Sequence, residues 1–107
     1  MRITHSLVNV AVALMESPTD SHWGYDLCQR SGVRSGVLYP ILHRMLEEGW
    51  VSDGWEEQAN QRGPARRFYR LSDAGVLALG ALLADARKDR RFTAAPALGF
   101  ARFGFAR

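Results

Sequence analysis

Apolar residues recur at helical spacing in four segments of the chain and alternate with polar residues in two others. The clearest helix is the segment from Ser35 to Gly49, where apolar side chains every three or four positions predict one buried stripe: Leu38, Ile41, Leu42, Met45 and Leu46. Ser35 is a favourable N-cap and Gly49 a favourable stop. A proline such as Pro40 in the interior of a helix destabilises the helix by about 3 kcal/mol. We therefore expect the helix to begin near Val37 or Leu38.

Polar side chains occupy the opposite face of this helix: Tyr39, His43, Arg44 and Glu47. Aromatic, imidazole and guanidinium groups on one helix face are able to read the edges of DNA bases. The same groups also occur on ordinary hydrated surfaces, and Tyr39 is able to pack on a neighbour such as Arg44. The flanking segments decide between these interpretations.

Two helices are expected before the central one. Residues 3–16 carry so much apolar surface that burial on more than one side is predicted, which indicates a partner chain. Residues 22–30 predict a short helix, capped by Ser21 or Asp20 and stopped by Gly32. This second helix buries an apolar side that includes Trp23, Leu27 and Cys28.

A β-hairpin is expected after Gly49. Residues 50–57 and 65–71 predict strands, joined by a polar loop over residues 58–64. Alternation in the second strand places Tyr69 and Leu71 on the inward face. The hairpin is basic, because no acid lies among residues 62–70, which include Arg62, Arg66, Arg67 and Arg70. Arg70 is alternatively a brace that pairs with Glu56 or Glu57.

The last predicted helix spans residues 73–91, with Ser72 as N-cap and Asp73 beside the positive helix end. At 1.5 Å per residue it is about 28 Å long, more than one hairpin is able to cover. We therefore expect it to be a dimerisation element. The tail, residues 93–107, is either disordered or docked on a partner.

Composition narrows the class of protein. At 107 residues with 47% hydrophobic content, the chain is an ordinary globular domain, with no apolar run long enough for a membrane span. The chain has one cysteine, Cys28, which is consistent with a reducing cytoplasm. We expect its side chain to be unreactive and to pack on the apolar side of its helix. The net charge of +3 is weak support for DNA binding, because residues 1–71 carry eight Arg against eight Asp or Glu.

Three helices, a hairpin and a last helix form the order of a winged helix. The predicted fold class is α+β, mainly α, a winged helix-turn-helix with a C-terminal dimerisation helix. We expect a winged-helix DNA-binding domain over residues 1–71, the dimerisation helix over residues 72–92 and the tail after it.

Four segments carry a specific resemblance: residues 24–27 (GYDL), 36–50 (GVLYPILHRMLEEGW), 55–57 (WEE) and 62–75 (RGPARRFYRLSDAG). Together they resemble the PadR family of bacterial transcriptional regulators, over roughly residues 3–90. The single short C-terminal helix resembles the compact branch of that family. The resemblance implies a cytoplasmic homodimer that represses promoters and releases DNA when an effector or stress signal arrives.

The predicted DNA contacts follow from this order of elements. The central helix is expected to lie in the major groove of double-stranded DNA. The β-hairpin over residues 50–71, which is the wing of this fold, is expected to contact phosphates or the minor groove. The predicted DNA-binding residues are Ser35, Tyr39, His43, Arg44, Arg62, Arg66 and Arg67. Two-fold symmetry predicts a pseudo-palindromic operator with half-sites about one turn apart.

The first and last helices are expected to form the dimer interface, through Leu7, Val10, Leu14, Val76, Leu79, Leu83 and Ala86. The resemblance implies an effector pocket between the same helices, and Leu7, Ala11, Leu79 and Leu83 are its candidate lining. Members of the family that bind flat drugs often carry a tryptophan on the last helix. This chain has none there, so a stacked-drug pocket is not indicated; Trp23, Trp50 and Trp55 are expected in the core or at hinges.

No cofactor is expected to be required, although a small molecule or a divalent metal is a possible effector. His43 and Glu47 have chelating spacing, and His5 and His22 are further weak metal candidates. No nucleophile has a matched base, so an enzyme is not expected. Two alternatives to a DNA-binding repressor stay open. One is a protein-interaction module with a winged-helix shape, and the other is a metal or small-molecule sensor whose DNA binding is secondary.

Overall fold

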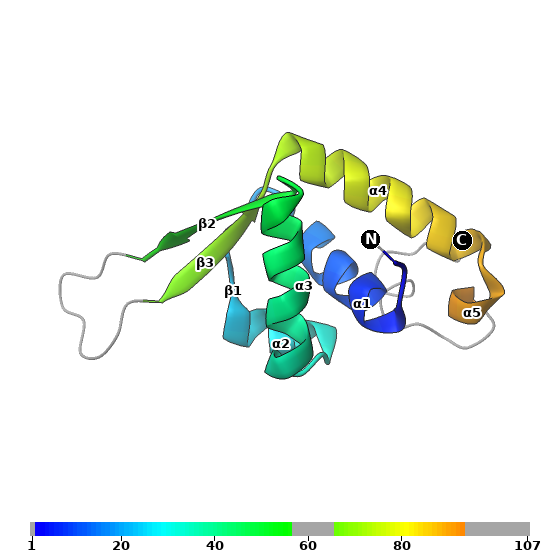
Figure 1. The fold of residues 1–107 in the computed structure, drawn as a ribbon, viewed down its shortest axis with the longest axis horizontal. Helices are drawn as coiled ribbons and strands as arrows, with labels where there is room; N and C mark the ends of the chain where they lie inside the picture. The colour runs from blue at the N-terminus through cyan, green and yellow to red at the C-terminus, as the bar shows by residue number, and fades with distance from the viewer. Residues whose placement is uncertain (1, 57–65, 94–107) are drawn as a thin grey trace.

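A computed structural model describes residues 2–56 and 66–93 of the chain. It is mainly helical, with one small antiparallel sheet that projects from the helices (Figure 1). The elements in order are α1 (His5–Met15), β1 (His22–Trp23), α2 (Gly24–Ser31), α3 (Ser35–Glu47), β2 (Val51–Trp55), β3 (Arg67–Leu71), α4 (Asp73–Lys88) and α5 (Arg90–Thr93). The predicted α+β, mainly α winged-helix order is confirmed.

Helix α1 lies at the centre of the hydrophobic core. The side chain of Thr4 caps it by accepting a hydrogen bond from the amide of Leu7, at 3.1 Å. Its buried side chains are Leu7, Val8, Val10, Ala11, Val12, Ala13 and Leu14. Since they point to several sides of the helix, α2, α3 and α4 all pack around it (Figure 1). The predicted burial on more than one side is confirmed, but this chain alone supplies the covering.

The predicted helix over residues 22–30 is wrong at its start. His22 and Trp23 instead form β1, which pairs with β3 through the register His22↔Tyr69 and Trp23↔Phe68. Helix α2 therefore begins at Gly24, and Trp23 is its cap residue. Pairing with a strand far along the chain outweighs the local capping signal of Ser21 and Asp20.

Helix α3 begins earlier than its sequence predicts. Arg34 is the cap residue and makes no side-chain hydrogen bond, so the predicted N-cap role of Ser35 is wrong. The helix continues through Pro40, which lies exposed on its surface. Burial of Leu38 and Leu42 on the inner side holds the turns on either side of the proline. Tertiary packing therefore overcomes the lost amide hydrogen bond.

The glycine stops are confirmed. Gly49 has φ +76° and Gly32 has φ +72°, the left-handed conformation that glycine adopts without a Cβ clash. After α3 the amide of Trp50 donates to the carbonyl of Met45 at 2.9 Å. This turn sends the chain directly into β2.

The sheet has the strand order β1-β3-β2, with both pairings antiparallel. Tyr69 is buried and Leu71 packs against the core, which confirms the predicted inward face of β3. The predicted brace from Arg70 to Glu56 is wrong, because Arg70 Nε donates to Ser21 Oγ at 3.0 Å. The predicted loop over residues 58–64 and Glu57 lie outside the described residues.

The last predicted helix is divided. Ser72 caps α4 as predicted, since its hydroxyl accepts from the amide of Gly75 at 3.0 Å. Helix α4 ends at Lys88 because Asp89 is extended, and α5 then turns back (Figure 1). This turn buries Phe92, whose ring lies edge-on to His5 at a centroid distance of 4.7 Å. Of the predicted tail, residues 94–107 lie outside the described part.

Candidate nucleic-acid interface

The outward face of α3 carries four of the predicted DNA-binding residues in exposed positions: Ser35, Tyr39, His43 and Arg44. His43 Nε2 lies 3.9 Å from Glu47 Oε2, and Arg44 Nε lies 3.6 Å from Glu48 Oε1. Both pairs join exposed side chains one helical turn apart, where ion pairs are weak. A phosphate or a base edge is therefore able to displace either carboxylate at small cost.

The start of strand β3 brings two of the predicted arginines, Arg67 and the preceding Arg66, beside α2 and α3. Arg67 is held by Asp53 of β2, to which its Nε donates at 2.8 Å, and this hydrogen bond raises the pKa of Arg67 above its usual value. The guanidinium of Arg67 also lies 5.3 Å from the ring centre of Tyr69 and 5.9 Å from that of Trp55. Arg67 is thus a fixed positive charge beside the helices, and Trp55 is a largely exposed residue of the wing. Arg62 lies outside the described residues.

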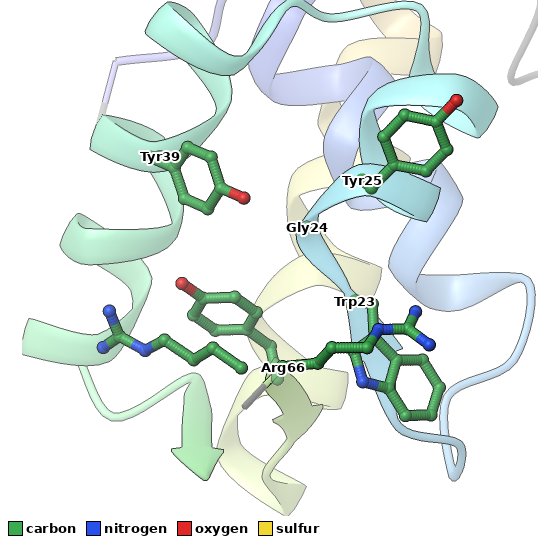
Figure 2. A pocket seen from close by; sticks show the side chains of 7 residues that line it. Trp23, Gly24, Tyr25, Tyr39 and Arg66 are labelled. Atoms are coloured by element: carbon green, nitrogen blue, oxygen red, sulfur yellow. The ribbon is translucent and has the colours of Figure 1, made fainter. Parts of the chain in front are cut away.

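Arg66 extends toward Trp23 of β1. Its guanidinium lies over the indole of Trp23 at 5.0 Å from the ring centre, as Figure 2 shows. The carboxylate of Glu56 is 4.0 Å away, at the limit of an ion pair. The charge of Arg66 is therefore placed by an aromatic surface and only loosely balanced by an acid.

A pocket of about 190 Å³ opens where α2, α3 and β3 meet (Figure 2). It is lined by Trp23, Gly24, Tyr25, Tyr39, Arg66, Arg67 and Tyr69. Tyr39 points from α3 toward α2, so a Cβ at Gly24 would lie 2.1 Å from its hydroxyl oxygen. Only glycine permits this approach. Tyr39 is 45% exposed, so it is at once a surface residue of α3 and a wall of the pocket.

The sequence did not identify this pocket or the roles of Trp23, Tyr25 and Tyr69 in it. The alternation of β3 correctly turned Tyr69 inward, but it left open what the hydroxyl faces. The strand pairing of His22 and Trp23 with β3 assembles the pocket, and it depends on residues 47 (69 − 22) and 45 (68 − 23) positions apart. The one local signal is the glycine before Tyr25, since glycine permits close approach of another side chain.

His22 connects this region to α1. Its ring is buried, Nε2 lies 2.9 Å from the carbonyl of Ser17, and Nδ1 lies 2.7 Å from a guanidinium nitrogen of Arg30. The neutral ring with its proton on Nε2 satisfies both contacts, since Nδ1 then accepts from Arg30. Burial, and to a smaller extent the charge of Arg30, lowers the pKa of His22 below 6.5.

The residues of the predicted dimer interface lie mostly in the core of the single chain. Of these seven residues, six are buried in the core of the single chain: Leu7, Val10, Leu14, Leu79, Leu83 and Ala86. Val76 is half-buried. In this arrangement α1 and α4 bury these side chains against each other. The candidate effector lining lies in the same core, since Leu7, Ala11, Leu79 and Leu83 are all core residues.

The four weak metal candidates are not brought together. His5 contacts Phe92, His22 is bound by Ser17 and Arg30, and only His43 and Glu47 are neighbours. Within residues 2–56 and 66–93, no three His, Cys, Asp or Glu side chains are placed to hold a metal ion. In the same ranges no helix has the length and apolar content needed to cross a membrane.

The family model of the transcriptional regulator PadR-like family matches residues 18–81. The chain belongs to this family. The match includes α2, α3, the hairpin and the first half of α4, which are the elements that form the exposed basic surface and the pocket. Because PadR-like proteins are transcriptional regulators, membership confirms the expected function class and the expectation that the chain is not an enzyme.

Solved structures agree with this assignment. The smu.1704 protein of Streptococcus mutans has 25% identity and a TM-score of 0.61, over 79% of this chain and 80% of that one. A PadR-like transcription factor from Bacteroides fragilis has 26% identity and a TM-score of 0.60, over 78% and 84%. PadR of Bacillus subtilis, solved in complex with operator DNA, shares the fold at 20% identity and a TM-score of 0.57, over 72% and 47%. No protein with a curated description matches the chain.

Proposed function

We propose that this PadR-like regulator binds double-stranded DNA in a sequence-specific manner. The observation that carries the proposal is that Tyr39, on the exposed polar face of α3, lines one pocket together with Arg66 and Arg67 at the start of β3 (Figure 2). A helix fits the major groove, about 12 Å wide, and the strand beside it then meets the flanking backbone. Ser35, Tyr39, His43 and Arg44 are the proposed contacts of α3, and Arg66 and Arg67 those of the strand.

We further propose that the chain acts as a homodimer through the outer face of α4. Exposed apolar residues recur there at three- and four-residue spacing: Ala74, Leu77, Ala81 and Ala84. Leu77 is 76% exposed, the most exposed large hydrophobic side chain of the described residues. Small residues around one leucine permit two such helices to approach closely, and a two-fold dimer requires a pseudo-palindromic operator.

Dimerisation is tested with Leu77→Arg. A charge in the centre of the α4 pair is expected to convert the dimer to a monomer in light scattering after size exclusion, with the melting temperature of the monomer unchanged. Lys88→Ala, a surface change near the end of the same helix, is the matched control. A wild-type chain that is monomeric at high micromolar concentration would contradict the proposed dimer.

Repression in the cytoplasm, relieved by an effector, is the regulatory mode that we propose. It rests on the family resemblance and on the operator complex of the Bacillus subtilis neighbour. The effector is a small molecule or a divalent metal. No site for it is assigned, because the apolar positions first considered are filled by core packing.

DNA binding is tested by selecting duplexes from a random library with the wild-type protein and measuring their affinity at two salt concentrations. His43→Ala is expected to reduce the preference for selected over scrambled duplex, because it removes a side chain from the face of α3. Arg66→Ala is expected to weaken both duplexes equally. Arg90→Ala is the matched control, since α5 lies at the end of the molecule opposite the wing (Figure 1).

Failure to bind any duplex at low salt would overturn the proposal and favour a protein-interaction module. Binding in which Arg66→Ala and Arg90→Ala lose equal affinity would also contradict it, because the charge of β3 would then have no special position. A metal or small molecule that binds the protein without changing its DNA affinity would favour the alternative of a separate sensor.

A further inference from the structure

The pocket between α2, α3 and β3 is lined by a tyrosine whose hydroxyl group has no hydrogen-bond partner among the described residues. Tyr69 is 2% exposed, and within residues 2–56 and 66–93 its hydroxyl makes no hydrogen bond, although the side chain lines the pocket. A hydroxyl group that lines a pocket and has no protein partner is available to hydrogen-bond a ligand. Burial raises the pKa of Tyr69, so the phenol keeps its proton and is a donor.

The pocket also contains the first turn of α2. Gly24 and Tyr25 open this eight-residue helix and line the pocket, and the cap residue Trp23 makes no side-chain hydrogen bond to them. First-turn amides and the helix dipole attract an anion. The indole Nε1 of Trp23 is a buried donor without a hydrogen-bond partner among the described residues.

The charges around the pocket are positive in sum. Arg66 and Arg67 line it, whereas no acidic side chain of residues 2–56 or 66–93 does. Of the described carboxylates, Asp53 holds Arg67 and Asp26 lies 2.9 Å from Arg30, whereas Glu56 Oε2 lies 4.0 Å from Arg66 and makes no hydrogen bond. An anion that enters the pocket therefore meets the donors of its lining and competes with Glu56 for Arg66.

We propose that this pocket binds one backbone phosphate of the DNA duplex, held by the hydroxyl groups of Tyr69 and Tyr39, the guanidinium of Arg66 and the first turn of α2. The inference rests on the proposed function. A volume of about 190 Å³ is smaller than the 300–1,000 Å³ typical of small-molecule sites, and it suits a phosphodiester group. Tyr39 thus acts on the DNA backbone and so fixes the register of α3 in the groove.

The role assigned to Tyr39 differs from base reading. Its hydroxyl lies over Gly24, so the side chain that leaves α3 at the surface ends in the pocket and not in the groove. Tyr39→Phe is therefore expected to weaken selected and scrambled duplexes to the same extent. His43→Ala, in contrast, is expected to reduce discrimination between them.

The test combines Tyr69→Phe with duplexes in which single phosphates are replaced by neutral methylphosphonates. The duplex is one selected by the wild-type protein. Tyr69→Phe is expected to bind the unmodified duplex about tenfold more weakly, as for a lost hydrogen bond to a charged group. The wild type is expected to lose affinity at one phosphate of each half-site, and Tyr69→Phe to lose clearly less at that position. This non-additivity identifies the phosphate that the hydroxyl contacts.

A structural role for Tyr69 gives a different pattern. The variant is expected to keep its melting temperature within about 2 °C, because the lost hydroxyl had no protein partner. Gly24→Ala is the second variant: its Cβ meets the hydroxyl of Tyr39, displaces it from the pocket and leaves the helix intact, with a similar loss of affinity.

The outcomes separate the two proposals. If Tyr69→Phe and Gly24→Ala bind the duplex as tightly as the wild type, the phosphate site is overturned and the proposed function stands. Equal losses at every methylphosphonate position in variant and wild type overturn it in the same way. If the wild type selects no duplex at all, the proposed function fails, and the phosphate site fails with it.

Discussion

The core around α1 and the pocket beside α2 are built on opposite principles. In the core, Val10, Ala11 and Leu14 are fully buried among apolar neighbours supplied by the same chain. At the pocket, the hydroxyl of Tyr69 and the indole nitrogen of Trp23 are left without a partner among the described residues. The core is filled by its own apolar side chains, whereas the pocket contains hydrogen-bond donors without a protein partner. Stability and recognition are therefore placed in different parts of a small domain.

The largest effect on stability is expected when a side chain of the core is shortened. Leu14→Ala is expected to lower the free energy of unfolding by about 2–5 kcal/mol, because the side chain is fully buried and the surrounding helices only partly collapse. Urea unfolding monitored by circular dichroism measures the loss. A destabilisation below about 1 kcal/mol would show that the end of α1 is not part of the core.

The junction between α4 and the turn after α3 is the next most sensitive position. A Cβ at Gly75 would lie 1.9 Å from the carbonyl oxygen of Trp50, which is backbone and cannot rotate away. Gly75→Ala is therefore expected to lower the free energy of unfolding by about 1–3 kcal/mol, despite the better helix propensity of alanine. Gly80→Ala is the matched control, since its Cβ would meet nothing within 4 Å and should be neutral or stabilising.

The dependence of the free energy of unfolding on pH tests whether His22, between the core and the pocket, is buried in its neutral form. Burial lowers the pKa of His22 in the folded state below 6.5, so below that pH the unfolded chain binds the proton more readily. The free energy of unfolding is therefore expected to fall as pH decreases from about 7.5 toward the folded pKa. His22→Gln is expected to remove most of this decrease, whereas His43→Gln, at an exposed site, keeps it. If the free energy of unfolding of His22→Gln depends on pH as in the wild type, His22 is not the group that causes the decrease.

The smallest effect is expected at the outer face of α3. Glu47→Gln is expected to change the free energy of unfolding by no more than about 0.5 kcal/mol, because its pair with His43 is exposed and 3.9 Å long. The same change is expected to strengthen binding to every duplex, since it removes a negative charge beside the proposed DNA surface. Thermal melting and fluorescence anisotropy measure the two quantities; a large stability change would contradict an exposed pair.

The sequence predicted most of the fold because its signals are local. Helical spacing identified α1, α3 and α4, glycine identified the ends of α2 and α3, and alternation turned Tyr69 inward. The errors arose where distant residues decide the structure. His22 and Trp23 became a strand because β3 pairs with them, and α4 stopped early because the turn at Asp89 buries Phe92.

The candidate site was less predictable than the fold. Basic residues of the wing and polar residues of α3 follow from the sequence, but the pocket requires three elements to meet. The broad apolar surface of α1 predicted a partner chain, whereas α2, α3 and α4 provide the covering. Periodicity shows that a face is buried and does not show which chain buries it. The exposed Leu77 on α4 became visible only when the buried face of that helix was known.

The central claim is that Arg66 and Arg67, at the start of β3 and beside α3, neutralise DNA phosphates. It is tested most directly by the dependence of duplex affinity on salt, measured for the wild type and for Arg66→Ala. The logarithm of the binding constant is expected to fall linearly with the logarithm of salt concentration, and Arg66→Ala should reduce the slope by about 1. Arg90→Ala should keep the wild-type slope. A slope that Arg66→Ala leaves unchanged, or the absence of binding at low salt, would contradict the claim.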